Sequence, residues 1–436
     1  MKNTKGITLI ALIITIIVML ILVAVSISVA LNTGLFKSAG DATKNWKSAQ
    51  DAEANVGSEI KIGDKTYASI EDYLEGKVKL PEGAGKRFSE TKEYNDGTKT
   101  AWIPAGFTVS GTKSETTIDG GLVIYDIPEN EIENVIWDGT EKTKYNQFVW
   151  IPVEVNKTTE PKDTETSIAS FYRSKWSNNA RTQGLSTSYT EPNTTNDTND
   201  KTGIASQIEN LTKSIYKYGG FYIGRYEAGS EKERNSSSGK TAIGIKQDMF
   251  PYNYVKWGES MSNIGEVGAV ALSNSLYNSS NYGATSMLCT GACWDSVLDF
   301  IKDEGHNVTN SIAWGNYMDA EFEITRGKYA EIVNGILGSF TAFAGTYKKE
   351  LYSVSNKIIL LTTGATERNS AKNIYDVAGN FSEWTTESYS SGVRVSRGGY
   401  YNYSGSVTPA YGRVIRHSPD YSHNSISFRP TLYVNL

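Results

Sequence analysis

Residues Asn373–Thr385 read NIYDVAGNFSEWT, and the shorter stretches Arg397–Gly399 (RGG) and Phe428–Pro430 (FRP) follow them. The glycines of these stretches are suited to tight turns, where a side chain would clash. The aromatic residues offer large apolar surfaces for burial, and the arginines can bind carboxylates or carbonyls through bidentate hydrogen bonds. We therefore predict a structural role for six residues: Trp384, Arg397, Gly398, Gly399, Phe428 and Arg429.

Three earlier segments complete an ordered set: Phe148–Pro152 (FVWIP), Gly220–Glu227 (GFYIGRYE) and the pair Trp294-Asp295. Together the segments resemble the formylglycine-generating-enzyme (sulfatase-modifying-factor) domain, whose fold is a variant of the C-type lectin fold. The resemblance spans roughly residues 95–436. It implies an α+β protein in which a C-type-lectin-variant domain, rich in short strands and loops, follows a long N-terminal helix.

Local patterns agree with this class. From residue 95 on, short runs of β-branched and aromatic residues lie between Gly, Pro or Asn, which is typical of strands. Apolar residues at Trp294, Val297, Leu298 and Ile301 follow helical spacing. Residues 156–206 are rich in Thr, Asn and Ser, so we predict a polar surface insertion there, partly disordered.

The N-terminus indicates an exported protein. Lys2 and Lys5 precede an uncharged, strongly apolar run from Ile7 to Leu31. As a helix, this run is long enough to cross a bilayer, and the lysines favour a cytoplasmic N-terminus. A cleaved secretory signal would have a shorter apolar region. The run therefore fits a membrane anchor, with the later domain outside the cytoplasm.

Residues Lys5–Ile10 (KGITLI) also resemble the leader of type IV pilins and pseudopilins. That resemblance implies cleavage between Gly6 and Ile7 by a prepilin peptidase, and assembly with other pilins in a filament. Ala11 stands where the family usually has Glu, which puts polymerisation in doubt; a plain signal anchor is the alternative. The expected organisation is a leader (1–6), a pilin-like helix (7–60), a linker with a short helix (61–94) and the lectin-like domain (95–436).

Charge and cysteine placement argue against two functions. The net charge is -5 with no basic patch, so we do not expect nucleic acid as a partner. Formylglycine-generating enzymes use two cysteines shortly after the RGG motif, whereas here the only cysteines, Cys289 and Cys293, lie far upstream. We therefore expect no enzyme activity. Each cysteine is interpreted as a buried small hydrophobic residue or as half of a disulfide.

The resemblance also implies one metal. Related domains often hold a structural calcium near the AGNxxEW segment, and Asn380 and Glu383 carry oxygen ligands of the required type. We expect no other cofactor.

The composition changes between residues 400 and 427, where Tyr, Ser, Asn, His and Asp dominate. Tyrosine gives rigid amphipathic contact area and the small polar residues give adaptable hydrogen bonds, as in antibody binding loops. This arrangement resembles the variable proteins of diversity-generating retroelements; an ordinary tyrosine-rich surface is the alternative. The candidate contact residues are Tyr400, Tyr401, Asn402, Tyr403, Tyr411, His417, Asp420, Tyr421, His423 and Asn424.

The favoured hypothesis is a non-catalytic adhesin or receptor on a bacterial cell surface or pilus, which binds a protein, a phage or a glycan. Two alternatives remain: an exported enzyme of the sulfatase-modifying-factor type, and a purely structural pilus subunit.

Overall fold

The computed structural model describes residues 13–21, 60–62, 65–67 and 79–436, apart from 138, 159–167, 169, 193–201, 278–281, 304, 335, 343–344, 346 and 390–391. The chain divides into two compact units, Met1–Leu80 and Pro81–Leu436. The second unit begins before the expected boundary at residue 95. Its first segment is bonded to the rest of the unit, because Phe88 N–H donates to Phe107 and Gly85 N–H donates to Val109.

In the first unit, residues 13–21 are helical, and a short hairpin pairs β1 (Ile60–Ile62) with β2 (Lys65–Tyr67). Strand β1 lies where the pilin-like helix was expected to end. The cleavage position Gly6–Ile7, most of the helix, and the interior of the 61–94 linker lie outside the described residues. Within the described part of the chain, no helix has both the length and the apolar character needed to span a bilayer.

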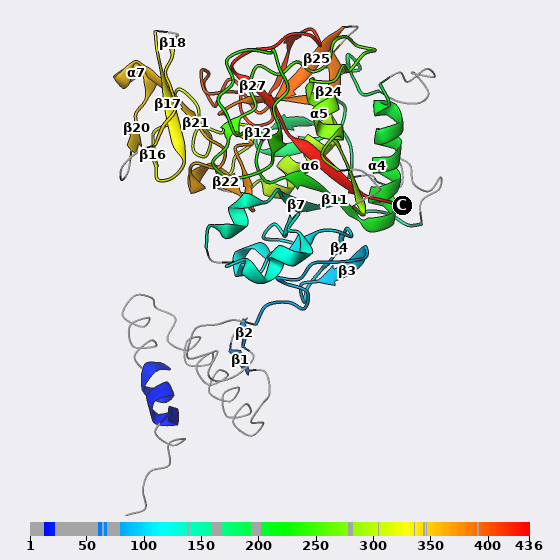
Figure 1. Ribbon diagram of the computed structural model, residues 1–436, viewed down its shortest axis with the longest axis vertical. Helices are drawn as coiled ribbons and strands as arrows, with labels where there is room; N and C mark the ends of the chain where they lie inside the picture. Colours follow the sequence, from blue (N-terminus) through cyan, green and yellow to red (C-terminus); the bar gives the residue numbers. More distant parts are fainter. Residues whose placement is uncertain are drawn as a thin grey trace, which may run out of the picture. The chain divides into compact units, whose positions relative to one another are not determined.

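The second unit is built on an antiparallel sheet of six strands (Figure 1). In order across the sheet, these are β15 (Ala284–Leu288), β28 (Pro430–Val434), β11 (Gly220–Gly224), β7 (Gln147–Pro152), β6 (Val123–Tyr125) and β5 (Thr108–Val109). Successive side chains point to opposite faces. Ile151 and Phe221 therefore belong to one apolar core, whereas Trp150 and Tyr222 belong to another. The sheet is buried on both sides.

Helices and small hairpins cover this sheet. Helix α6 (Gly291–Ile301) contributes Trp294, Val297, Leu298 and Ile301 to the first core, at the spacing that predicted it. Helix α4 (Ile204–Tyr218) ends at Gly219, and α5 (Ala269–Asn274) packs into the second core. The hairpins are β3 (Lys92–Asn95) with β4 (Thr100–Ile103), β8 (Lys175–Ser177) with β9 (Ala180–Thr182), and β22 (Ser370–Ala371) with β23 (Ile374–Tyr375). A small three-stranded sheet has the order β13 (Ile243–Gly244), β12 (Gly229–Ser230), β14 (Phe250–Pro251).

A second sheet holds the motif segments together. Its strands run in the order β10 (Tyr189–Thr190), β24 (Ser382–Tyr389), β25 (Val393–Arg397) and β26 (Arg413–His417), and β27 (Ile426–Phe428) pairs in parallel with β24. The candidate contact region is thus two loops on either side of β26. Strand β26 lies at an edge of the sheet.

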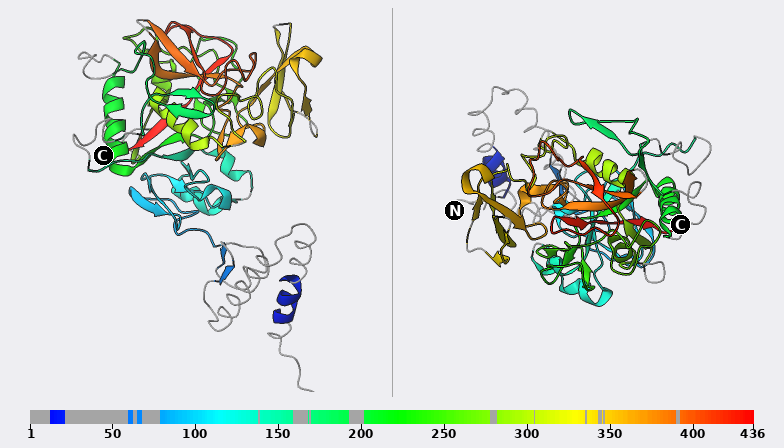
Figure 2. Two further views of the ribbon diagram at one scale, coloured as in Figure 1. Left: turned by 180° about the vertical axis from the view of Figure 1, so that it is seen from behind. Right: turned by 90° about the horizontal axis from the view of Figure 1, so that it is seen from above.

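Residues 322–361 form a smaller body, called here the side lobe, which projects from one side of the unit (Figures 1 and 2, yellow). Its elements are β16 (Phe322–Ile324), β17 (Lys328–Val333), β18 (Ile336–Leu337), β19 (Thr341–Ala342), β20 (Tyr347–Lys349), α7 (Tyr352–Ser355) and β21 (Lys357–Leu361). Strand β17 pairs with β18, β19 and β21, while β16 pairs with β20.

The stretch 156–206 differs from the surface insertion that was predicted. Phe171 and Trp176 are buried in the first core, and Trp176 Nε1–H donates to Asp295 at 3.0 Å. Strand β10 within this stretch pairs with β24. The polar composition hid these anchors, because a few aromatic side chains suffice to attach a long polar segment.

Both helices and antiparallel strands are present and most strands are short, as expected for an α+β protein.

Candidate ligand-binding face

Two sets of buried charged residues hold in place the strands that flank the candidate loops. Arg429 makes a two-point contact with Glu383, with Nη2 to Oε1 at 2.5 Å and Nε to Oε2 at 2.9 Å. Arg429 also donates to the carbonyls of Gly224 and Tyr375. This guanidinium therefore ties β24 to β11 and to β23.

The second set joins helix α6 to the sheet. Asp295 contacts Arg397 and Arg413, each at 2.7 Å, and both arginines also contact Glu387. Burial alone would raise the pKa of Asp295, but Arg397 and Arg413 outweigh it and hold that pKa below its usual range. Arg397 ends β25 and Arg413 begins β26, so this set fixes both ends of the first candidate loop.

Two glycines start that loop in a conformation that L side chains rarely adopt. Gly398 has φ 89° and Gly399 has φ 68°. A Cβ on Gly399 would lie 1.9 Å from the carbonyl oxygen of Thr408, so the two limbs of the loop approach each other too closely for any side chain.

The first candidate loop, residues 398–412, is held by its backbone. Met318 N–H donates to the carbonyl of Tyr403, and Ser311 N–H donates to that of Gly405. In the other direction, Tyr411 N–H donates to Val308 and Tyr401 N–H to Asn380. Because these bonds use main-chain atoms of the loop, the loop path does not depend on its exposed side chains.

The second candidate loop, residues 418–425, is held in the same way. The carbonyl of Pro419 accepts from the N–H groups of Trp257 and Gly258, and that of His423 accepts from Tyr254. Ser382 N–H donates to Ser425, which joins the end of the loop to β24. The loop therefore rests on residues 253–258 and on the second sheet.

The ten predicted contact residues differ in exposure. Asn402, Tyr403, Asp420 and His423 are exposed; Tyr400, Tyr411, His417, Tyr421 and Asn424 are half-buried; Tyr401 is buried. Tyr411 packs against the first core, beside Val308, and not with the other aromatic residues.

Tyr401 requires a correction, because it cannot be a direct contact residue. It is 4% exposed and packs edge-on against Phe381. Its hydroxyl donates to Asn424 Oδ1 at 3.1 Å, which links the first loop to the second beneath the surface. Composition alone gave no means of separating this tyrosine from its neighbours at 400 and 403.

The other aromatic candidates form two groups. Tyr400 and Tyr403 lie with ring centroids 4.8 Å apart. In the second group, His417 stacks on Tyr421 at 4.1 Å, and the ring of Tyr421 is also nearly parallel to that of His423 at 6.0 Å. Partial burial lowers the pKa of His423, so this ring is neutral at physiological pH. The region thus offers flat aromatic surfaces bordered by Asn402 and Asp420.

The proposed calcium ligands already have protein partners. Both oxygens of Glu383 bind Arg429. Asn380 donates to Glu227 at 2.7 Å, and its Oδ1 accepts from Asn316 and from Leu361 N–H. Within the described ranges, the structure contains no group of three or more His, Cys, Asp or Glu side chains arranged for a metal ion.

Cys289 and Cys293 are both buried and unpaired. Burial raises the pKa of both thiols, with that of Cys293 at about 12, so neither is a thiolate at neutral pH. Each cysteine is therefore a small buried residue, as in the first of the two interpretations made from the sequence, and the two do not form a disulfide.

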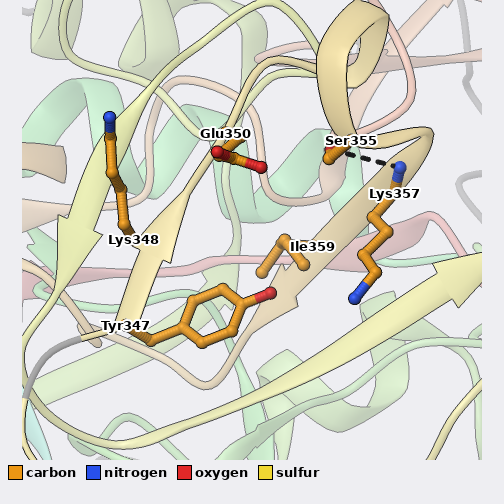
Figure 3. A pocket seen from close by; sticks show the side chains of 6 residues that line it. All are labelled: Tyr347, Lys348, Glu350, Ser355, Lys357 and Ile359. Atoms are coloured by element: carbon orange, nitrogen blue, oxygen red, sulfur yellow. Dashed lines mark hydrogen bonds between the residues drawn. The ribbon is translucent and has the colours of Figure 1, made fainter.

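A separate hollow lies on the side lobe (Figure 3). It has a volume of about 170 Å³ and is lined by Tyr347, Lys348, Glu350, Ser355, Lys357 and Ile359. Along β21, Ile358 and Leu360 point into the core beside Tyr401, whereas Ile359 points the other way. Ile359 thus lies on the opposite face of the lobe sheet from the candidate tyrosines.

Sequence reasoning missed the side lobe and missed Glu387 as a partner of Arg397 and Arg413. The lobe segment carries no recognisable motif. Glu387 lies within β24, where alternation could at least have placed it on the same side as Glu383.

No protein-family model matches the chain, and no curated protein matches it. Among solved structures, the chain is similar to Treponema denticola variable protein 1, with 15% identity and a TM-score of 0.28, over 49% of this chain and 84% of that chain. At that score the likeness assigns neither a fold nor a function to this chain.

Proposed function

We propose that this protein is a non-catalytic, ligand-binding protein of the bacterial cell surface or of a pilus. The observation that carries this proposal is the construction of the two loops between β25 and β27. Their backbones are bonded to fixed parts of the unit, while Asn402, Tyr403, Asp420 and His423 are exposed. Binding sites commonly combine a rigid frame with loop side chains of this kind.

The finer parts of the proposal rest on sequence. The ordered motifs support a C-type-lectin variant related to the formylglycine-generating-enzyme domain, and the apolar run after Lys5 supports attachment to a membrane or a filament. The Tyr, Asn, Ser, Asp and His content of residues 400–427 supports diversification. The ligand is then a protein, a phage or a glycan, since a lectin-like fold does not by itself indicate a sugar.

Binding is tested by screening the full chain against a phage-displayed library of random peptides and against a glycan array. The matched variant carries Asn402→Ala and Tyr403→Ala, which removes two exposed side chains of the first loop. We expect at least a tenfold weaker affinity for the ligands selected on the unaltered chain, with an unchanged melting temperature. Equal affinity of both chains would refute the assignment of this face.

Diversification is tested by deep sequencing of the gene in a growing population. We expect adenine-focused substitutions at the codons of Asn402, Tyr403, Asp420 and His423, and none at Arg413 or Ile426, which support the frame. If codons 400–427 vary as little as the rest of the gene, the protein is a binding protein whose contact residues do not diversify.

A further inference from the structure

The side lobe packs directly beside the first candidate loop. A small apolar core contains Ala330, Ile332, Ile358 and Leu360 of the lobe together with Phe381 and Tyr401. Partly buried side chains from both sides border this core: Leu337, Phe340 and Tyr352 from the lobe, and Tyr400 from the loop. The candidate tyrosines and the lobe aromatics therefore surround one shared core.

The backbone places them at close range. Met318 N–H donates to the carbonyl of Tyr403, and the carbonyl of Met318 accepts from Tyr352 N–H. Met318 thus bonds to both tyrosines through its own backbone.

Phe340 is fixed on the same border. Its ring lies 5.2 Å from that of Phe250, and its N–H donates to Glu233. Phe340 and Tyr352 are therefore positioned by residues that belong to the frame and not to the 400–427 region.

We infer that the ligand-binding face continues from residues 400–427 onto the side lobe, where Tyr352 and Phe340 are fixed contacts, and that its partner is a folded protein. This inference rests on the proposed function. A stable protein interface takes roughly 800 Å² and about 20–30 residues from each partner, more than the candidate loop residues supply. The lobe adjoins the first candidate loop and can supply further contact area.

Exposed aliphatic side chains favour a protein over a glycan. Val407 in the first loop and Val354 in helix α7 are each 70% exposed. Aliphatic and aromatic side chains together form the centre of protein interfaces, with polar groups at the rim. Sugar hydroxyls would be desolvated against such valines without a hydrogen-bonding partner.

The test uses the full chain and peptides selected from the phage-displayed library on the unaltered protein. Tyr352→Ala is compared with Tyr347→Ala, a half-buried tyrosine of the same lobe beside the hollow of Figure 3. Tyr347→Ala controls for any loosening of the lobe. Ser353→Arg adds bulk and charge at an exposed position of α7 without touching the shared core.

We expect Tyr352→Ala and Ser353→Arg to weaken peptide binding at least tenfold, as Tyr403→Ala does, while Tyr347→Ala leaves it unchanged. Loss with Tyr403→Ala alone would overturn the role of the lobe and leave the proposed function standing. If none of the four substitutions changes the affinity for the peptides, both the role of the lobe and the proposed binding face are refuted. Ligands found on the glycan array and not among the peptides would overturn the assignment of a protein partner.

Discussion

The carboxyl group of Glu227 is buried close to two other carboxyl groups, those of Asp376 and Glu383. Its Oε1 accepts from Asn380, and within the described residues its Oε2 has no hydrogen-bond partner. Burial, together with Asp376 and Glu383, raises the pKa of Glu227 well above its usual range. The folded protein therefore holds this proton to a higher pH than the unfolded chain does.

This protonation gives a prediction with a defined sign. The folded state holds a proton that the unfolded chain releases above its ordinary pKa of 4.5. The native protein therefore loses stability as the pH rises from there through the folded pKa of Glu227. Glu227→Gln does not titrate. Urea unfolding at pH 5, 7 and 9 should therefore show the difference in stability shifting in favour of the variant as the pH rises. A constant difference would contradict the assignment.

Glu115→Gln is the matched control with the opposite sign. Burial would raise the pKa of Glu115, but Arg225 and Lys142 lower it to about 2. Glu115 therefore stabilises the protein above pH 4.5, and this contribution is lost as the pH falls toward 2. Glu115→Gln should cost about 3 kcal/mol at pH 7, and less in acid.

Gly399 supplies a second prediction at this scale. Gly399→Ala would combine a positive φ with a contact of 1.9 Å to the Thr408 carbonyl. Gly184→Ala has a similar φ of 84° and open space around its Cβ. We expect about 1 kcal/mol of lost stability for Gly184→Ala and clearly more for Gly399→Ala, measured by chemical unfolding. Equal losses of stability would mean that the two limbs of the first candidate loop can move apart at Gly399 and Thr408 without destabilising the protein.

At the scale of elements, Asp295 joins helix α6 to strands β25 and β26. Asp295→Asn would leave Arg397 and Arg413 short of a buried counter-charge, at a cost of about 3–5 kcal/mol. Asp299 lies on the same helix, and its carboxylate, which is 38% exposed, pairs with Arg181 and Lys302. Asp299→Asn should therefore reduce stability by about 1 kcal/mol at most. Thermal unfolding of the two variants measures the difference. Similar melting temperatures would show that the buried set carries no stability.

The elements also show where sequence reasoning succeeds and where it does not. Helix α6 followed from the spacing of Trp294, Val297 and Leu298, because one face of a helix repeats in sequence. The burial of Tyr401 did not follow, since its core partners come from Ala330 and Ile358, which are distant in sequence. Local patterns reveal periodic elements, but the side of a loop that becomes buried depends on which segment folds against it.

At the scale of the molecule, the two calcium ligands proposed in the AGN segment already bind other protein groups. Both oxygens of Glu383 contact Arg429, and Asn380 is fully engaged. We therefore expect dialysis against EDTA, or addition of millimolar calcium, to leave the melting temperature unchanged. A rise with calcium would show that the ion displaces Arg429, and Asn380→Ala should then abolish that rise.

The main-chain anchoring of the first candidate loop has a consequence for evolution. Since Tyr403 is held through its carbonyl oxygen, replacing the exposed neighbour Asn402 removes none of the main-chain bonds that fix the path of the first loop. Natural selection on folding and natural selection on recognition therefore act on different atoms of the same short segment. The lineage can explore new specificities at such positions without first accumulating compensating stabilising mutations elsewhere.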